Sequence, residues 1–288
     1  MIIGDIMKTR MVLEGGSFRG LFTAGVLDVL MENNINIDEI VGVSAGAVFG
    51  VNYFSKQKGR VIRYNKRFCN SKRYMSILSL IFTGNYINRK FAFYDVTKKY
   101  DIFDNDEYIK TNKNFYAVAT NIESGKPEYI KITSPLEQLE VLRASSSVPL
   151  ISRIVKLNNK KYLDGGISDS IPYKYNMDKY KKNIIILTQP LDYKKKPIAN
   201  KKIKLINFRY KKYPKLIETM MNRYKNYNRT IREIIKLEEK GKVFVIRPSK
   251  SLDIKLSEKN PEKLQEIYDM GVKEGKKILK DLKKYLDC

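Results

Sequence analysis

The chain contains no histidine and no tryptophan, and it has only two cysteines, Cys69 and Cys288. Histidine is the usual base beside a serine or cysteine nucleophile and a frequent zinc ligand, so its absence removes the commonest form of both chemistries. Two distant cysteines make no disulfide framework and leave a structural zinc site nearly excluded. We therefore expect no metal site and no cofactor, in a protein of a reducing compartment or one indifferent to redox conditions.

Long apolar runs are also absent. No segment approaches the roughly 20 residues of a membrane-spanning helix. The N-terminal residues "MIIGDIMKTRM" carry Asp5 inside a short apolar run and lack a cleavage-like segment, so we expect no signal peptide. The predicted location is the cytoplasm.

Negative charge is scarce, because 56 Lys and Arg oppose 31 Asp and Glu. The excess is uneven: residues 1–170 hold 24 basic and 17 acidic side chains, whereas residues 171–288 hold 32 and 14. Such a field attracts anionic partners, either nucleic acid or an anionic membrane at its inner face. A lysine-rich surface without a partner is an equal alternative. No nucleic-acid motif is present, so no specific nucleic acid is predicted.

The order of apolar segments indicates the fold class. Residues 11–13 form a short apolar run before glycines, and residues 21–34 have helical spacing. A second strand is expected over 37–44, with a helix restarting at Ala45. Strand, helix, strand and helix within about fifty residues predict an α/β fold with a parallel sheet.

The later segments extend this pattern. The elements expected up to Pro190 are a strand pair (114–124 and 127–132), a helix with Ser134 as N-cap and Pro135 at its first position, a hairpin around Asn158-Asn159 and a buried parallel strand (183–190). Beyond Pro190 we expect a charged connector (191–204), a long amphipathic helix ending at Gly241, a strand (243–248) and a final basic helix (260–286). We predict one domain over 9–190 and a basic, mostly helical extension over 191–288 packed on it.

The pentapeptide Gly42-Val43-Ser44-Ala45-Gly46 has the Gly-x-Ser-x-Gly pattern of serine hydrolases. A nucleophilic serine on a sharp strand-to-helix turn requires small residues on both sides, and the motif falls where an apolar run gives way to a helix. The alternative is a tight turn that carries an inert serine.

Without histidine, a carboxylate is the best remaining base for Ser44, provided that it lies about 3 Å from the hydroxyl. Asp164 is the strongest candidate, because it ends a predicted strand and Gly165 and Gly166 allow the chain to turn it inward. Judged locally, Asp-Gly-Gly is more often a simple hairpin turn.

The segment "EGGSFRG", Glu14–Gly20, is a candidate oxyanion hole. A glycine-rich turn between strand and helix directs several backbone N–H groups at one spot. A nucleotide phosphate loop is the weaker alternative, because no Gly-Lys-Ser/Thr ending follows and Ser17 occupies the place of a third glycine.

Taken in order, "EGGSFRG", "GVSAG" and "DGG" resemble the motifs of the patatin-like phospholipase family, and "RASSSVP" at 143–149 resembles the segment before its base motif. The resemblance covers roughly residues 9–190. It implies a three-layer sandwich with a mainly parallel central sheet flanked by helices, and a Ser–Asp dyad that works without histidine. It implies Ser44 as nucleophile and Asp164 as proton acceptor, with the N–H groups of Gly15, Gly16, Ser17 and Arg19 as oxyanion hole.

The resemblance implies a lipid acyl-ester substrate of the phospholipase A type. A hydrolase of soluble esters or thioesters is the first rival, and a non-enzymatic basic protein that binds nucleic acid is a weaker one. An apolar island at 74–84, flanked by Lys72, Arg73, Arg89 and Lys90, suggests peripheral contact with an anionic membrane surface. A helix that caps the core with solvated flanks is an equal alternative.

Overall fold

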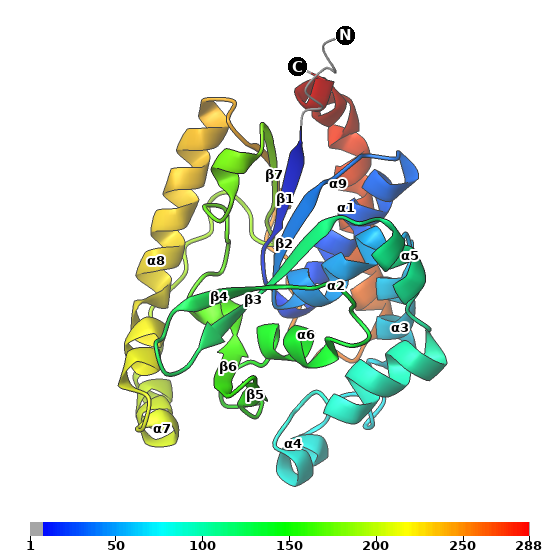
Figure 1. The fold of residues 1–288 in the computed structure, drawn as a ribbon. Helices are drawn as coiled ribbons and strands as arrows, with labels where there is room; N and C mark the ends of the chain where they lie inside the picture. The colour runs from blue at the N-terminus through cyan, green and yellow to red at the C-terminus, as the bar shows by residue number, and fades with distance from the viewer. Residues whose placement is uncertain (1–7, 288) are drawn as a thin grey trace.

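The computed structural model describes residues 8–287 of the 288-residue chain (Figure 1). Residues 1–7 and Cys288 lie outside the described residues. The first of these two parts includes most of the N-terminal segment in which we expect no signal peptide. The strands are β1 (Thr9–Leu13), β2 (Glu39–Val43), β3 (Asn114–Asn121), β4 (Pro127–Lys131), β5 (Val155–Leu157), β6 (Lys160–Asp164), β7 (Lys182–Ile186) and β8 (Phe244–Ile246). The helices are α1 (Gly20–Glu32), α2 (Ala45–Phe54), α3 (Arg60–Phe68), α4 (Ile77–Thr83), α5 (Asn105–Lys110), α6 (Leu139–Ser145), α7 (Asn200–Tyr210), α8 (Pro214–Glu239) and α9 (Pro261–Asp287), with a π-helix at Lys90–Tyr100.

The described residues form one eight-stranded sheet in the order β5-β6-β3-β2-β1-β7-β8, with β4 also paired to β3. The pairs β1–β2, β2–β3, β1–β7 and β7–β8 are parallel, whereas β4 and β6 run antiparallel to β3. The prediction of a mainly parallel α/β sheet is confirmed. Its parallel strands are buried, which explains why they appear in the sequence as continuous apolar runs.

Helices cover the sheet on both faces, which gives the expected three layers (Figure 1). Because side chains alternate along a strand, neighbouring residues of β1 enter different cores. Met11 and Leu13 pack in a cluster with apolar residues of α1, α2 and α9. Val12 packs in another cluster with Tyr227 and other side chains of α8. The long helices α8 and α9 therefore lie on opposite faces of the sheet.

The region after residue 190 is built into this architecture. Strand β8 pairs with β7, and α9 packs along α1. The two helices approach so closely that a Cβ atom added to Gly271 would overlap the carbonyl oxygen of Phe22. The boundary expected at residue 190 remains a prediction.

Two local expectations differ from the structure. Helix α6 begins at Leu139, and Ser134–Glu137 form a turn in which the Gln138 side chain accepts hydrogen bonds from the N–H groups of Thr133 and Ser134. Ser134 and Pro135 therefore do not start the helix, because a side chain further along satisfies the backbone there. Helix α7 begins inside the predicted connector, at Asn200, and continues to Tyr210; lysines between its apolar residues conceal it in the sequence.

Helix α4 projects from the body of the molecule at the bottom of Figure 1. Its side chains Ile77, Leu78, Ile81 and Phe82 are all more than half exposed. A bridge between Met75 and Ile87 closes the base of this projection. Among residues 8–287, no helix is long and apolar enough to cross a bilayer.

The close approach of α1 and α9 predicts how substitutions at their contact change the stability of the fold. Gly271→Ala should lower the free energy of unfolding by about 2–3 kcal/mol, because the new methyl group meets backbone that moves only with its helix. Urea unfolding measures the change. Gly275→Ala is the matched control on the same helix, since its Cβ would meet the Val29 side chain at 3.1 Å and should cost much less. Equal losses in both variants would contradict this account.

Candidate active site

Ser44 occupies the turn between β2 and α2. Its backbone angles are φ 54° and ψ −120°, in the left-handed half of conformational space, and the side chain is buried. Such a backbone costs of order 1–3 kcal/mol and persists only where the surroundings enforce it. Gly46 permits the turn, because a Cβ atom there would lie 2.5 Å from the Leu13 carbonyl oxygen; Gly42 is crowded against Gly46 in the same way. The expected sharp strand-to-helix turn is present.

The register of β3 brings Asp164 to this turn. Val118 of β3 pairs with Val43 of β2, and the next residue, Ala119, pairs with Asp164 of β6. The residues that end β2 and β6 therefore meet beside the same point of β3. Ser44 Oγ donates a hydrogen bond of 2.7 Å to Asp164 Oδ2.

Further hydrogen bonds fix both partners. Asp164 Oδ1 accepts from the Gly166 N–H at 2.8 Å, and the Asp164 N–H donates to the Ser147 carbonyl oxygen at 2.9 Å. The Ser44 N–H donates to Ser145 Oγ at 3.0 Å. Ser145 and Ser147 belong to the segment "RASSSVP", which is part of the resemblance. The sequence alone did not predict which contacts these two serines make. Gly165 is required after Asp164, because a Cβ atom there would overlap the Val118 carbonyl oxygen.

Burial controls the ionisation of Asp164. Loss of hydration raises the pKa of this carboxyl above its ordinary value, since a charged group is disfavoured away from water. The hydrogen bond from Ser44, the positive charge of Arg223 and the hydrogen bond from Gly166 act in the opposite direction but do not cancel the effect of burial. A carboxylate with a raised pKa is a stronger base than an exposed aspartate.

The glycine-rich loop lies directly against Ser44. A Cβ atom added to Gly15 would approach Ser44 Cβ to 3.0 Å. The Arg19 N–H donates to the Gly16 carbonyl oxygen at 3.0 Å, so this expected oxyanion donor is already occupied. Within residues 8–287, the N–H groups of Gly15 and Gly16 donate no hydrogen bond to the protein. Ser17 has φ 50°, which explains why a glycine would fit this position more easily.

Glu14 anchors this loop, a role that the sequence did not reveal. Its carboxylate is buried and accepts hydrogen bonds from the Thr188 N–H at 2.6 Å and from Tyr227 Oη at 2.9 Å. Burial raises the pKa of Glu14, and these bonds partly offset the increase. The loop is thereby connected to the end of β7 and to α8, whose residues lie far away in the sequence.

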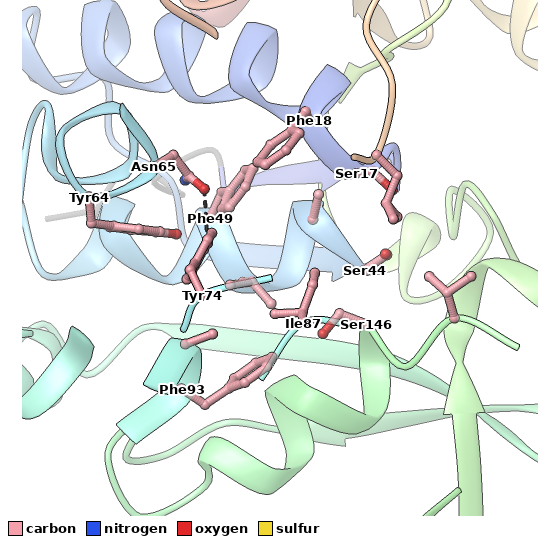
Figure 2. A pocket seen from close by; sticks show the side chains of 15 residues that line it. Ser17, Phe18, Ser44, Phe49, Tyr64, Asn65, Tyr74, Ile87, Phe93 and Ser146 are labelled. Atoms are coloured by element: carbon pink, nitrogen blue, oxygen red, sulfur yellow. Dashed lines mark hydrogen bonds between the residues drawn. The ribbon is translucent and has the colours of Figure 1, made fainter. Parts of the chain in front are cut away.

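Two cavities meet at Ser44. The first has a volume of about 90 Å³ and is mainly apolar, with Phe18, Phe49 and Phe93 in its wall (Figure 2). The second has a volume of about 180 Å³ and is mainly polar. Ser17, Ser44 and Val148 border both cavities. The hydroxyl of Ser44 therefore lies where an apolar and a polar part of one ligand would join.

The polar cavity contains two cations that the sequence analysis missed, Lys195 and Arg223. Lys195 lies in the run Lys194–Lys196, and nothing in the pattern distinguishes it from its neighbours. Arg223 is one of several basic residues on α8. Within residues 8–287, no group of three or more Cys, Asp or Glu side chains is arranged to hold a metal ion.

Comparison with known protein families identifies the group to which this site belongs. The family described as "Patatin-like phospholipase" matches residues 11–177. The chain belongs to the patatin-like phospholipase family. All three patatin-like motifs fall inside the matched residues. A second family, described as a domain of unknown function (DUF6363), matches residues 213–287, which include α8 and α9.

Two curated proteins are similar to the chain. The "Uncharacterized protein YjjU" of Escherichia coli (strain K12) is 32% identical over 185 residues, which are 62% of this chain and 51% of that protein. The "Probable lipid hydrolase 463L" of Invertebrate iridescent virus 6 is 25% identical over 199 residues, 60% of this chain and 66% of that protein. A crystal structure of VipD from Legionella pneumophila aligns with 96% of this chain and 67% of that one, at 14% identity and a TM-score of 0.47. The chain thus spans between half and two thirds of the length of these curated relatives.

Proposed function

We propose that this patatin-like chain is a lipid acyl hydrolase of the phospholipase A type that uses Ser44 and Asp164 as a catalytic dyad. The observation that carries the proposal is the 2.7 Å hydrogen bond from Ser44 Oγ to the buried Asp164 carboxylate. The apolar cavity beside Ser44 supports an acyl chain as the group that is transferred. The name of the viral relative, a probable lipid hydrolase, agrees with this substrate class.

The proposed reaction has two steps. In the first, Ser44 Oγ attacks the ester carbonyl carbon while Asp164 takes the hydroxyl proton, and the N–H groups of Gly15, Gly16 and Ser17 stabilise the oxyanion. The bond to the alcohol then breaks, and Asp164 returns its proton to the leaving oxygen. In the second step, water gives a proton to Asp164 and attacks the carbonyl carbon of the acyl-enzyme. The bond to Ser44 Oγ then breaks, Asp164 passes the proton to Ser44 Oγ, and the fatty acid is released.

Removal of either dyad residue tests this reaction. Ser44→Ala and Asp164→Asn should each lower kcat on a medium-chain p-nitrophenyl ester and on phospholipid vesicles by roughly 10³-fold or more, because nucleophile and base act as one unit. Stopped and continuous hydrolysis assays measure the rates, with circular dichroism to verify folding. Ser249→Ala and Asp192→Asn, which change the same groups at exposed positions, are the matched controls.

Either an inert wild type or folded dyad variants with the wild-type rate would disprove the proposed activity. A wild type that cleaves short soluble esters or thioesters best and ignores vesicles would favour the soluble-ester rival. A salt-sensitive nucleic-acid gel shift without hydrolysis would favour the non-enzymatic rival.

The raised pKa of Asp164 predicts the pH at which activity is lost on the acid side of the pH–rate profile. The base must be ionised, so kcat/KM should rise with pH along one ionisation whose midpoint lies above the ordinary aspartate value of 3.8. Activity should therefore be lost on acidification at a higher pH than an exposed aspartate would give. Initial rates between pH 4 and pH 8 on an uncharged ester, roughly the range spanned by tuned carboxylate bases, measure this loss. A rate that stays constant down to about pH 4, the lower end of this range, would contradict a buried base.

We also propose that α4 attaches the chain to an anionic lipid surface. Its exposed apolar side chains stand beside a groove lined by Arg73, Arg89, Lys90 and Arg153. Apolar insertion flanked by basic charge is the pattern of an interfacial helix. The bridge that closes this projection joins Met75 to Ile87, and both Ile87 and Tyr74, the neighbour of Met75, also line the apolar cavity. A lipid surface bound to α4 would therefore lie near the entrance for an acyl chain.

Substitution within α4 tests the attachment. Ile81→Asp and Phe82→Asp should each weaken binding to vesicles of mixed phosphatidylglycerol and phosphatidylcholine by roughly 10-fold or more, since each change removes about 1.5–3 kcal/mol of apolar burial. Vesicle sedimentation measures the partitioning. Ile109→Asp on α5 is the matched control, because this isoleucine is also half exposed but lies away from α4. Equal losses in all variants would exclude α4 as the contact.

A further inference from the structure

The polar cavity beside Ser44 has an excess of positive charge. Arg19, Lys195 and Arg223 line it, together with the carboxylates Glu14 and Asp164. Both carboxylates already accept two hydrogen bonds each, Glu14 from Thr188 and Tyr227, and Asp164 from Ser44 and Gly166. Within residues 8–287, none of the three cations lies within salt-bridge distance of an acidic side chain. The cavity therefore presents three cations that form no ion pair with its two carboxylates.

Lys195 is held in this place rather than left free on the surface. Its backbone N–H donates to Asn228 Oδ1 at 2.9 Å, and Asn228 Nδ2 donates to the Lys195 carbonyl oxygen at 3.0 Å. Lys195 Nζ lies 4.5 Å from the centre of the Tyr227 ring. These contacts fasten a connector residue to α8 and orient its amine over the cavity wall.

The other two cations also have donors to spare. Among residues 8–287, the Arg223 side chain donates a single, long hydrogen bond of 3.4 Å from Nε to Ser170 Oγ. Its guanidinium borders Gly166 next to Asp164. Arg19 Nε is buried and has no hydrogen-bond partner among the described residues. A buried donor without a partner is costly, and an anionic ligand with several oxygens would satisfy it.

Repulsion among these cations contributes to a lowered pKa of the Lys195 amine. Burial lowers its pKa to about 8, and the charges of Arg223 and Arg19 add to the decrease, whereas Glu14 opposes it. A doubly charged anion in the cavity would relieve this repulsion, and phosphate oxygens match the planar donors of arginine.

The position of Ser44 decides which part of a substrate would carry that anion. An ester bound with its acyl chain in the apolar cavity and its carbonyl carbon at Ser44 Oγ directs its alkoxy part into the polar cavity. We propose that Arg19, Lys195 and Arg223 form a subsite for the phosphate of the leaving group, so that the region after residue 190 selects glycerophospholipid substrates. This inference rests on the proposed acyl hydrolase activity.

Two soluble substrates with the same acyl chains isolate the subsite from membrane binding. Dihexanoyl phosphatidic acid carries the phosphate and dihexanoylglycerol lacks it, and both are assayed as monomers. In the Lys195→Gln/Arg223→Gln double variant, the ratio of kcat/KM for the phosphate ester to that for the neutral ester should fall about 10- to 100-fold, mainly through KM. The ratio cancels any change that Arg223 makes to the basicity of Asp164.

The Lys194→Gln/Lys225→Gln chain is the control, because it loses the same charge at exposed positions next to Lys195 and on α8 and should keep the wild-type ratio. If the double variant does not fold, Lys195→Gln alone, outside the helices and strands, should still lower the ratio. An unchanged ratio in a folded variant would overturn the subsite while leaving the dyad intact.

A binding measurement separates this failure from failure of the proposed activity. Glycerol 3-phosphate should bind the Ser44→Ala chain in calorimetry, and binding should weaken about 10-fold or more when Lys195→Gln and Arg223→Gln are added. If the wild type cleaves neither ester, this loss still supports an anion site, and its absence overturns one. Inorganic phosphate that binds as tightly as glycerol 3-phosphate, with an unchanged substrate ratio, would identify a site for free phosphate and overturn the leaving-group assignment.

Discussion

The register of β3 is the constraint on which the candidate site depends. Val118 pairs with the last residue of β2 and Ala119 pairs with the last residue of β6, so one step along β3 separates the supports of Ser44 and Asp164. A shift of one residue would turn every side chain of the displaced strand to the other face of the sheet. The serine and the carboxylate, 120 positions apart in the sequence, therefore meet because three strands keep a single register.

This arrangement places a carboxylate where hydration is lost. Burial raises the pKa of Asp164, and three partners keep its ionised form accessible: the Ser44 hydroxyl, the Arg223 charge and the Gly166 N–H. The first and third come from turns inside the residues matched by the patatin-like family, but Arg223 comes from α8. Tyr227 of the same helix holds Glu14 beneath the glycine-rich loop. Helix α8 thus acts on both the proposed base and the glycine-rich loop, which connects the region after residue 190 to the candidate site.

The sequence predicted those features that depend on local physics. Continuous apolar runs identified β1, β2 and β7, and small residues around Ser44 identified the sharp turn. Asp164 was judged locally to be an ordinary hairpin turn, and only the order of several motifs favoured it as the base. The predicted start of α6 was wrong, because the Gln138 side chain accepts hydrogen bonds from the N–H groups of Thr133 and Ser134. Helix propensities do not include a hydrogen bond of this kind. In the sequence, Lys195 is indistinguishable from neighbouring lysines, because its position in the cavity depends on hydrogen bonds to Asn228, 33 positions away.

In a hydrolase without histidine, the protein environment must raise the basicity of a carboxylate to replace the imidazole as base. Imidazole is a base near neutral pH, whereas a hydrated carboxylate is not, so the carboxylate has to be buried to become basic. Asp164 is buried and borders the polar cavity. A further loss of hydration would favour its protonated form, which cannot accept the serine proton. Of the cations in the polar cavity, Arg223 opposes that outcome, because its positive charge lowers the pKa of Asp164. Arg223 lowers the pKa of the proposed base and also belongs to the proposed phosphate subsite, so this one side chain would connect the tuning of the base with the choice of substrate.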